Sequence, residues 1–345
     1  MHIDKKTLLA ACVAAALPAA ASAQTKLYGA LDAFAGYQKT NAGSRTLVDS
    51  GGMQTSYWGV SGSEDLGGGL KAVFALEGFL RNDTGETGRY NGDGVFSRSS
   101  YVGLDGGFGT VTLGRNTAPY FLSTILFNPF VDSFTFSPMV LHTFISGGSS
   151  YTFVNGDTGL SNSVRWRSPL WGGFRVDAAY SLGAENNADP KRAGRDLDVS
   201  AFYASGPLSA TLAYRGLNQD TALVSAKQTS MQAGVAYDLK VVKLFAQYQR
   251  SKSEASGPEQ LAKTYQVGAS VPLGAGKVLA SFASSKYEAS GNATLPSGDK
   301  RTNWALGYDY PLSKRTDVYV AYSNQKFRNP ETYSRIFGLG VRHAF

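Results

Sequence analysis

The sequence predicts an all-β fold, a transmembrane antiparallel β-barrel of sixteen strands, from two observations. Apolar residues alternate with small or polar residues at a period of two along the chain, as at 231–237 and 318–323. A soluble β-sandwich would alternate in the same way, so alternation alone does not separate the two classes. The connections separate them, because seven short ones alternate with eight long polar stretches, which gives an even number of strands.

The connections are expected at defined places along the chain. Short ones are predicted at 63–67, 105–109, 168–172, 205–207, 238–240, 272–275 and 311–315. Long polar stretches lie near 38–53, 81–94, 116–161, 182–196, 217–229, 251–262, 287–301 and 325–333. Short periplasmic turns and long external loops are typical of bacterial outer-membrane barrels. Sixteen strands leave an aqueous channel, whereas about eight strands fill their own interior.

Tyrosines lie toward the ends of the predicted strands, among them Tyr248, Tyr308 and Tyr322. Their amphipathic rings fit a belt at the membrane–water interface. Tyrosine favours strands in any case, so an ordinary strand position is the alternative interpretation.

Residues 1–23 have the features of a cleaved secretory signal. Two lysines precede an apolar run at 8–17, and small residues at 21–23 form a cleavage site. The run is far shorter than the roughly 20 residues of a spanning helix. The mature barrel domain is therefore expected to be 24–345. A lipoprotein box ending at Cys12 is a competing interpretation, although only five residues separate this cysteine from Lys6.

Cleavage would remove the only cysteine and change the net charge from +7 to +6, since Lys5, Lys6 and Asp4 are lost. An exported chain without disulfides needs another source of stability, and closing a barrel in lipid is one such source.

Composition excludes several other classes. The chain has 40 glycines, a mean hydropathy of −0.18 and no continuous apolar span in its mature part, which argues against a helical membrane protein. Lysine and arginine are spread along the chain, and an exported protein does not meet nucleic acid, so nucleic-acid binding is not expected. No nucleotide loop, zinc spacing or calcium loop occurs, so neither a cofactor nor a metal is predicted.

Two alternative functions share the predicted barrel. A barrel-embedded hydrolase needs a serine, a histidine and an orienting polar group. The histidines are only His2, His142 and His343, and His142, in the long loop, is hard to place beside a wall serine that faces lipid, so no enzyme is expected. A plugged structural or adhesive barrel would have the same strands but no conductance.

Several stretches resemble the general trimeric porins of Gram-negative bacteria: Lys26-Leu27-Tyr28-Gly29, the segment 63–74, the segment 101–115, and a last strand ending on Phe345. The resemblance implies an outer-membrane homotrimer in contact with lipid and lipopolysaccharide that passively conducts ions and small hydrophilic solutes. It also implies that Phe345 closes the barrel and is read by the outer-membrane assembly machinery.

The resemblance further implies that the third long loop folds into the lumen as a constriction. This loop is the longest, from about 116 to 161, and its core at 127–134 is rich in aromatic and apolar residues. A loop packed against a barrel wall has reason to be apolar, whereas an external loop does not. A surface loop for trimer contacts or recognition is the alternative.

Alternation places Arg165 and Arg167 on the lumen face, because Val164 and Trp166 take the lipid face. The resemblance adds Arg98 as a pore-lining residue and supports Arg167. Rings of like charge in a narrow passage select ions. Each arginine could instead be a wall residue held in a salt bridge.

Further charged positions complete the predicted lumen. Glu77 matches the family's acidic residue on the third strand, and Arg115 stands where the long loop begins. Lys39, at the root of the first long stretch, is a weaker candidate for the basic wall, with a solvated loop charge as its alternative.

Two positions depart from the family pattern. Tyr57 stands where similar porins commonly have a lumen arginine, and Asn128 stands where an acidic residue often precedes Pro129. Asp132 is the nearest carboxylate left in the loop. The predicted field at the constriction is therefore net positive and favours anions.

Overall fold

The computed structural model describes residues 24–145, 156–183, 194–218, 227–254, 259–290, 299–328 and 331–345. The predicted signal at 1–23 lies outside these residues, as do parts of several long loops. The described chain is almost entirely β-strand, with two short helices in the longest loop.

The strands follow the predicted order. They are β1 Gln24–Thr40, β2 Gly43–Ser50, β3 Tyr57–Gly67, β4 Leu70–Arg81, β5 Glu86–Thr87, β6 Ser99–Gly106, β7 Gly109–Thr117, β8 Gly159–Arg167, β9 Phe174–Ser181, β10 Leu197–Ser205, β11 Leu208–Asn218, β12 Lys227–Asp238, β13 Lys243–Glu254, β14 Gln260–Leu273, β15 Gly276–Ala289, β16 Asp299–Pro311, β17 Thr316–Phe327 and β18 Thr332–Ala344. The helices are α2 Pro119–Leu126 and α3 Pro138–Phe144.

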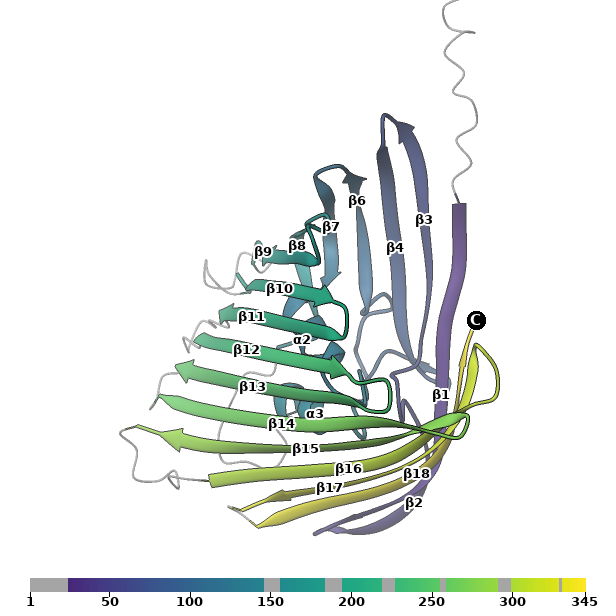
Figure 1. Cartoon of the computed structure of the whole chain (residues 1–345), viewed down its shortest axis with the longest axis vertical. Helices are drawn as coiled ribbons and strands as arrows, with labels where there is room; N and C mark the ends of the chain where they lie inside the picture. Colours follow the sequence, from purple (N-terminus) through teal and green to yellow (C-terminus); the bar gives the residue numbers. More distant parts are fainter. Residues whose placement is uncertain are drawn as a thin grey trace, which may run out of the picture.

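These segments form a closed barrel of sixteen antiparallel wall strands. Each strand pairs with its sequence neighbour, and β18 returns to pair with β1 from Ala30↔Ala344 to Thr40↔Ser334. Figure 1 shows the strands following one another round the wall, with α2 and α3 on its inner side. The two-residue β5 pairs only with β4 and belongs to a loop. The sixteen-strand prediction is therefore confirmed.

The second wall strand is built from two pieces, β2 and β3. Both pair with β1, β2 along 33–40 and β3 along 24–30. The expected long stretch at 38–53 is wrong for this reason, since β1 and β2 continue through it and meet at a two-residue turn, 41–42. The polar residues that suggested a loop belong to an extended hairpin whose edges are paired.

The seven short turns lie at or within a few residues of their predicted places. Several strands run further than expected into the long polar stretches, for example β13 to Glu254 and β14 from Gln260. Because short turns and long loops alternate along the chain, all short turns lie at one end of the barrel and all long loops at the other. No helix among the described segments is both long enough and apolar enough to cross a membrane.

The two faces of the wall differ as the alternation predicts. Outward positions carry exposed apolar side chains, such as Leu212, Val267 and Leu339. Inward positions carry buried polar side chains, such as Gln232 and Gln247. This is the pattern of a barrel with lipid outside and a polar interior.

The last residue takes part in closure. The Phe345 N–H donates to the Gly29 carbonyl at 3.1 Å, and the Gly29 N–H donates to the Phe345 carbonyl at 3.3 Å. A Cβ on Gly29 would lie 2.7 Å from Phe345 Cζ, so the glycine leaves room for this ring.

Candidate functional site

The loop between β7 and β8 folds against the inside of the wall. On α2, the Ser123 hydroxyl is hydrogen-bonded to Thr211 at 2.9 Å and donates to Ser200 at 3.0 Å. On α3, the Thr143 hydroxyl donates to Gln249 Oε1 at 2.8 Å. These wall partners are inward-facing residues of β10, β11 and β13, so the loop occupies part of the lumen (Figure 1).

Glycines on the inner wall make room for the apolar core of the loop. A Cβ on Gly234 would lie 2.9 Å from Phe127 Cγ, and one on Gly268 would lie 2.7 Å from Pro129 Cδ. Phe130 is fully buried, and a Cβ on Gly307 would lie 3.2 Å from its Cε1. The apolar residues at 127–134 therefore pack against the wall, as their composition predicts, and the loop lies close to it.

The tip of the loop is fixed to the break between β2 and β3. The Ser133 hydroxyl donates to the Gly52 carbonyl at 2.6 Å, and the Thr135 hydroxyl donates to the Gly51 carbonyl at 3.1 Å. The break itself is held by the buried carboxylate of Asp32, which accepts the N–H groups of Gly52 at 3.0 Å and Met53 at 2.9 Å. The interrupted strand is thus an anchor for the loop.

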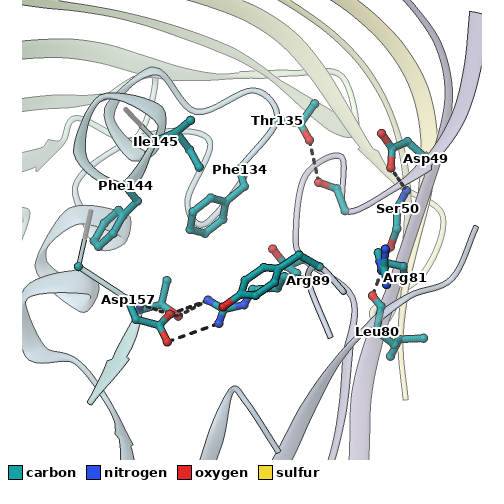
Figure 2. Close-up of a pocket in the computed structure, with 15 residues that line it drawn as sticks. Asp49, Ser50, Leu80, Arg81, Arg89, Phe134, Thr135, Phe144, Ile145 and Asp157 are labelled. Atoms are coloured by element: carbon teal, nitrogen blue, oxygen red, sulfur yellow. Dashed lines mark hydrogen bonds and ion pairs between the residues drawn. The ribbon is translucent and has the colours of Figure 1, made fainter. Parts of the chain in front are cut away.

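The far end of the loop is fixed by an ion-pair network around Asp157. Arg89 Nη1 lies 2.6 Å from Asp157 Oδ1, and Arg115 Nη2 pairs with Oδ2. Burial alone would raise the pKa of the Asp157 carboxyl, but Arg89 and Arg115 outweigh it and lower the pKa to about 2. Figure 2 shows Arg89 and Asp157 facing each other at the edge of a cavity of about 450 Å³ that Phe134 and Phe144 also line.

His142 on α3 lies against the inner wall, beside a serine that does not face the lipid. Its Nδ1 is 2.6 Å from the hydroxyl of Ser285, an inward wall serine that also bonds Thr264 at 2.7 Å. Both members of the pair are buried, and burial with the nearby Arg301 holds the pKa of His142 well below its usual range. No carboxylate orients the ring among the described residues, so the pair attaches α3 to the wall.

Arg98, directly before β6, and Glu77 on β4 form an ion pair. Arg98 Nη1 lies 2.6 Å from Glu77 Oε2, and the guanidinium stacks 3.9 Å from the centroid of the Tyr57 ring. Tyr28 donates to the other carboxylate oxygen at 2.6 Å. Glu77 therefore largely balances the charge of Arg98, and the Tyr57 ring packs against its guanidinium.

Asp132, at the loop tip, is half-buried and accepts from Gln54 Nε2 at 3.2 Å. This hydrogen bond holds the Asp132 carboxylate beside the break between β2 and β3.

A second basic group lies on β8 and β9. Arg165 and Arg167 both bind the buried carboxylate of Asp177, with Nε–Oδ distances of 2.7 and 3.3 Å. Arg165 is 8% exposed, whereas the side chain of Arg167 is 40% exposed. Arg175, two residues before Asp177 on the same inward face, stacks on Phe202 at 5.4 Å. Arg175 and Asp177 were missed, although alternation along 174–181 points both inward.

Three predicted lumen residues have other positions. Asn128 is 2% exposed, and its amide donates to the carbonyls of Thr124 and Val131, both at 3.0 Å, so it holds the loop's own turn. Lys39 lies two residues after the exposed Tyr37 on β1, so its side chain points outward and not into the lumen. Arg115 is tied to Asp157 and to the Ser97 carbonyl at 2.6 Å, so it anchors the loop end.

A closed transmembrane barrel with a polar interior, narrowed by an inward loop, defines a channel protein. No cluster of three or more metal-ligating side chains occurs among the described residues. A family model for the Gram-negative porins matches residues 8–330. The chain therefore belongs to the Gram-negative porin family, and it is an outer-membrane channel for ions and small solutes, not an enzyme.

The similar proteins are outer-membrane porins. An outer membrane porin protein of Bordetella pertussis is 31% identical over 99% of this chain and 100% of its own length. Outer membrane porin protein 32 of Delftia acidovorans is 32% identical over 91% of this chain and 88% of its own. The solved structure of an anion-selective porin from Comamonas acidovorans is 28% identical, with a TM-score of 0.80 over 94% of this chain and 100% of its own.

Proposed function

We propose that this porin prefers anions. The observation that carries the proposal is the basic group on β8 and β9, in which Arg165 and Arg167 pair with the single carboxylate of Asp177 and Arg175 stacks on Phe202 beside them. Likeness to a porin described as anion-selective supports it. Arg98 contributes little because Glu77 balances it, so the sign of the field depends on Arg167 and Arg175.

The net positive field should act over a short range. The Debye length is about 8 Å at physiological ionic strength and about 3 Å at 1 M salt. Anion preference is therefore expected to be strong in dilute salt and weak in concentrated salt. Asp132 opposes it from the loop tip, so Asp132→Asn should increase the preference.

The test replaces Arg167 and Arg175 by glutamine and measures the reversal potential across a planar bilayer in a KCl gradient. The double variant should shift toward cations, with normal folding because lumen substitutions mainly tune selectivity. Arg315→Gln with Arg335→Gln is the matched control, since both side chains are exposed outside the lumen. An equal shift in both double variants, or none in either, would show that the basic group does not set selectivity.

The proposal extends to maturation and assembly. The mature chain begins at Gln24 after signal cleavage, forms a homotrimer, and reaches the membrane through the assembly machinery that reads Phe345. The outer wall contacts lipid and lipopolysaccharide. Mass spectrometry of the purified protein tests the first step, and a lipidated Cys12 at the amino terminus would contradict it. Cross-linking of the intact protein tests the trimer.

A further inference from the structure

Four basic side chains form a row on the outer wall near the long-loop end of the barrel: Arg250 on β13, Lys263 on β14, Lys286 on β15 and Lys300 on β16. We call them the outer basic row. Each residue of the row lies directly opposite the next one on the neighbouring strand: Arg250↔Lys263, Lys263↔Lys286 and Lys286↔Lys300. The four strands are neighbours along one side of the wall (Figure 1). Adjacent strands are about 4.8 Å apart, so the row spans about 14 Å.

The row faces away from the channel. Its positions share the parity of exposed outward residues on the same strands: Tyr248 on β13, Tyr265 on β14, Phe282 on β15 and Trp304 on β16. The intervening positions, such as Ser285 and Thr264, are buried inward residues. The row therefore belongs to the surface that meets the membrane and takes no part in the predicted lumen charge.

Like charges directly opposite each other on neighbouring strands destabilise a sheet. The described residues offer little compensation, because only Glu288 bonds the row, at 3.3 Å from Lys263 and 3.1 Å from Lys286. Arg250 and Lys300 have no carboxylate partner among the described residues. Residues 255–258 and 291–298 contain no acidic residue in the sequence. The row thus carries an excess of positive charge that an anion from outside the chain would balance.

The height of the row on the barrel indicates which anion. Tyr248 and Tyr265, whose ring centroids are 4.9 Å apart, lie one outward position below Arg250 and Lys263. Two residues along a strand correspond to about 7 Å. Aromatic residues mark the membrane interface, and exposed apolar residues such as Val267 continue below them. The row therefore lies at the level of the headgroups of the leaflet nearest the long loops.

We propose that the outer basic row binds the phosphate groups of a phosphorylated glycolipid of that leaflet, with its acyl chains along the apolar wall below. This names the site for the lipopolysaccharide contact proposed above and rests on it. Clusters of lysine and arginine at a membrane surface recognise anionic lipid headgroups, each residue contributing about a fivefold factor in binding. The complementary charge and the aromatic belt below the row favour a lipid over a soluble acidic protein.

The experiment compares binding of the folded full-length protein to phosphatidylcholine vesicles that contain bisphosphorylated lipid A. The row variant carries Arg250→Gln, Lys263→Gln, Lys286→Gln and Lys300→Gln. The matched control removes one arginine and three lysines at the short-turn end, all of them exposed: Lys71→Gln, Lys240→Gln, Lys314→Gln and Arg315→Gln. The row variant should lose affinity at least about tenfold, while the control stays near wild type. Lipid A without phosphates should bind the wild type as weakly as bisphosphorylated lipid A binds the row variant.

Several results would overturn the proposal. If wild type and row variant bind the lipid A vesicles equally well, the row does not bind this lipid, and an acidic protein would be left as its occupant. If the row variant and the control variant lose the same affinity, the effect is not specific to the row. Complete displacement by inorganic phosphate would assign the row to free phosphate, and a changed oligomeric state of the row variant would assign it to a subunit contact. Conductance and reversal potential are measured on the same variants. They should be unchanged, because the row faces outward, so a failure of this site is distinct from a failure of the proposed selectivity.

Discussion

The contact between the loop and the glycines of the inner wall gives a quantitative prediction. A Cβ on Gly268 would lie 2.7 Å from Pro129 Cδ, and one on Gly234 would lie 2.9 Å from Phe127 Cγ. Carbon atoms in contact are about 3.5–4.0 Å apart, so alanine at either position must move the loop by about 1 Å. The wall behind is closed by paired strands, so the loop can move only toward the channel axis. The double variant Gly234→Ala, Gly268→Ala should therefore have a lower single-channel conductance than wild type.

The same substitutions should cost stability. Overpacking a well-packed site typically costs about 1–3 kcal/mol. Alanine also restricts the unfolded chain, which offsets about 0.4–1 kcal/mol of that cost at each position. Gly107→Ala is the control, since a Cβ there would meet nothing within 4 Å. Single-channel recording and denaturant unfolding of the three proteins are the assays. A folded double variant with wild-type conductance and stability would show that the loop does not press on these glycines.

Three further predictions concern closure, constriction and pH. Deleting Phe345 should sharply reduce heat-resistant folded protein on gels, because the closing pair at the last residue is lost, and a normal yield would refute this. Removing 121–144 should raise conductance if the protein folds, and an unchanged conductance would exclude the loop as the constriction. Asp157 has a pKa lowered to about 2, so its ion pairs with Arg89 and Arg115 contribute stability that is complete above its unfolded pKa of about 3.9 and lost as pH falls toward 2. Stability of the wild type should therefore fall more steeply than that of Asp157→Asn between about pH 4 and pH 2, and parallel curves would contradict the network.

The sequence predicted the wall better than the loop, for physical reasons. Alternation has a fixed period in a strand, so it correctly turned Arg165 and Arg167 inward. Alternation does not reveal the ion-pair partners of these arginines. Asp177, which binds both, is on the next strand, and its position opposite them depends on the register between β8 and β9. Irregular loops have no such period, and so Asn128, which looked like a lumen residue, turned out to hold a turn. Lys39 belongs to β1, and its parity along this strand turns it outward, away from the predicted basic wall.

The anchoring of the loop tip was not predictable from composition. Asp32 has the appearance of an ordinary polar residue on an alternating strand. Its role depends on the break at 51–56, whose N–H groups it accepts, and no local motif marks that break. Contacts of this kind join residues far apart in sequence and become visible only with the closed barrel.

The most direct test of the account is the reversal potential of the wild-type channel in a dilute KCl gradient. The basic group around Asp177 predicts that chloride passes more readily than potassium, and that the preference fades as the salt approaches 1 M and the Debye length falls to about 3 Å. A channel that prefers potassium in dilute salt would mean that Glu77, Asp132 or other lumen carboxylates outweigh Arg167 and Arg175, and the proposed anion selectivity would be wrong.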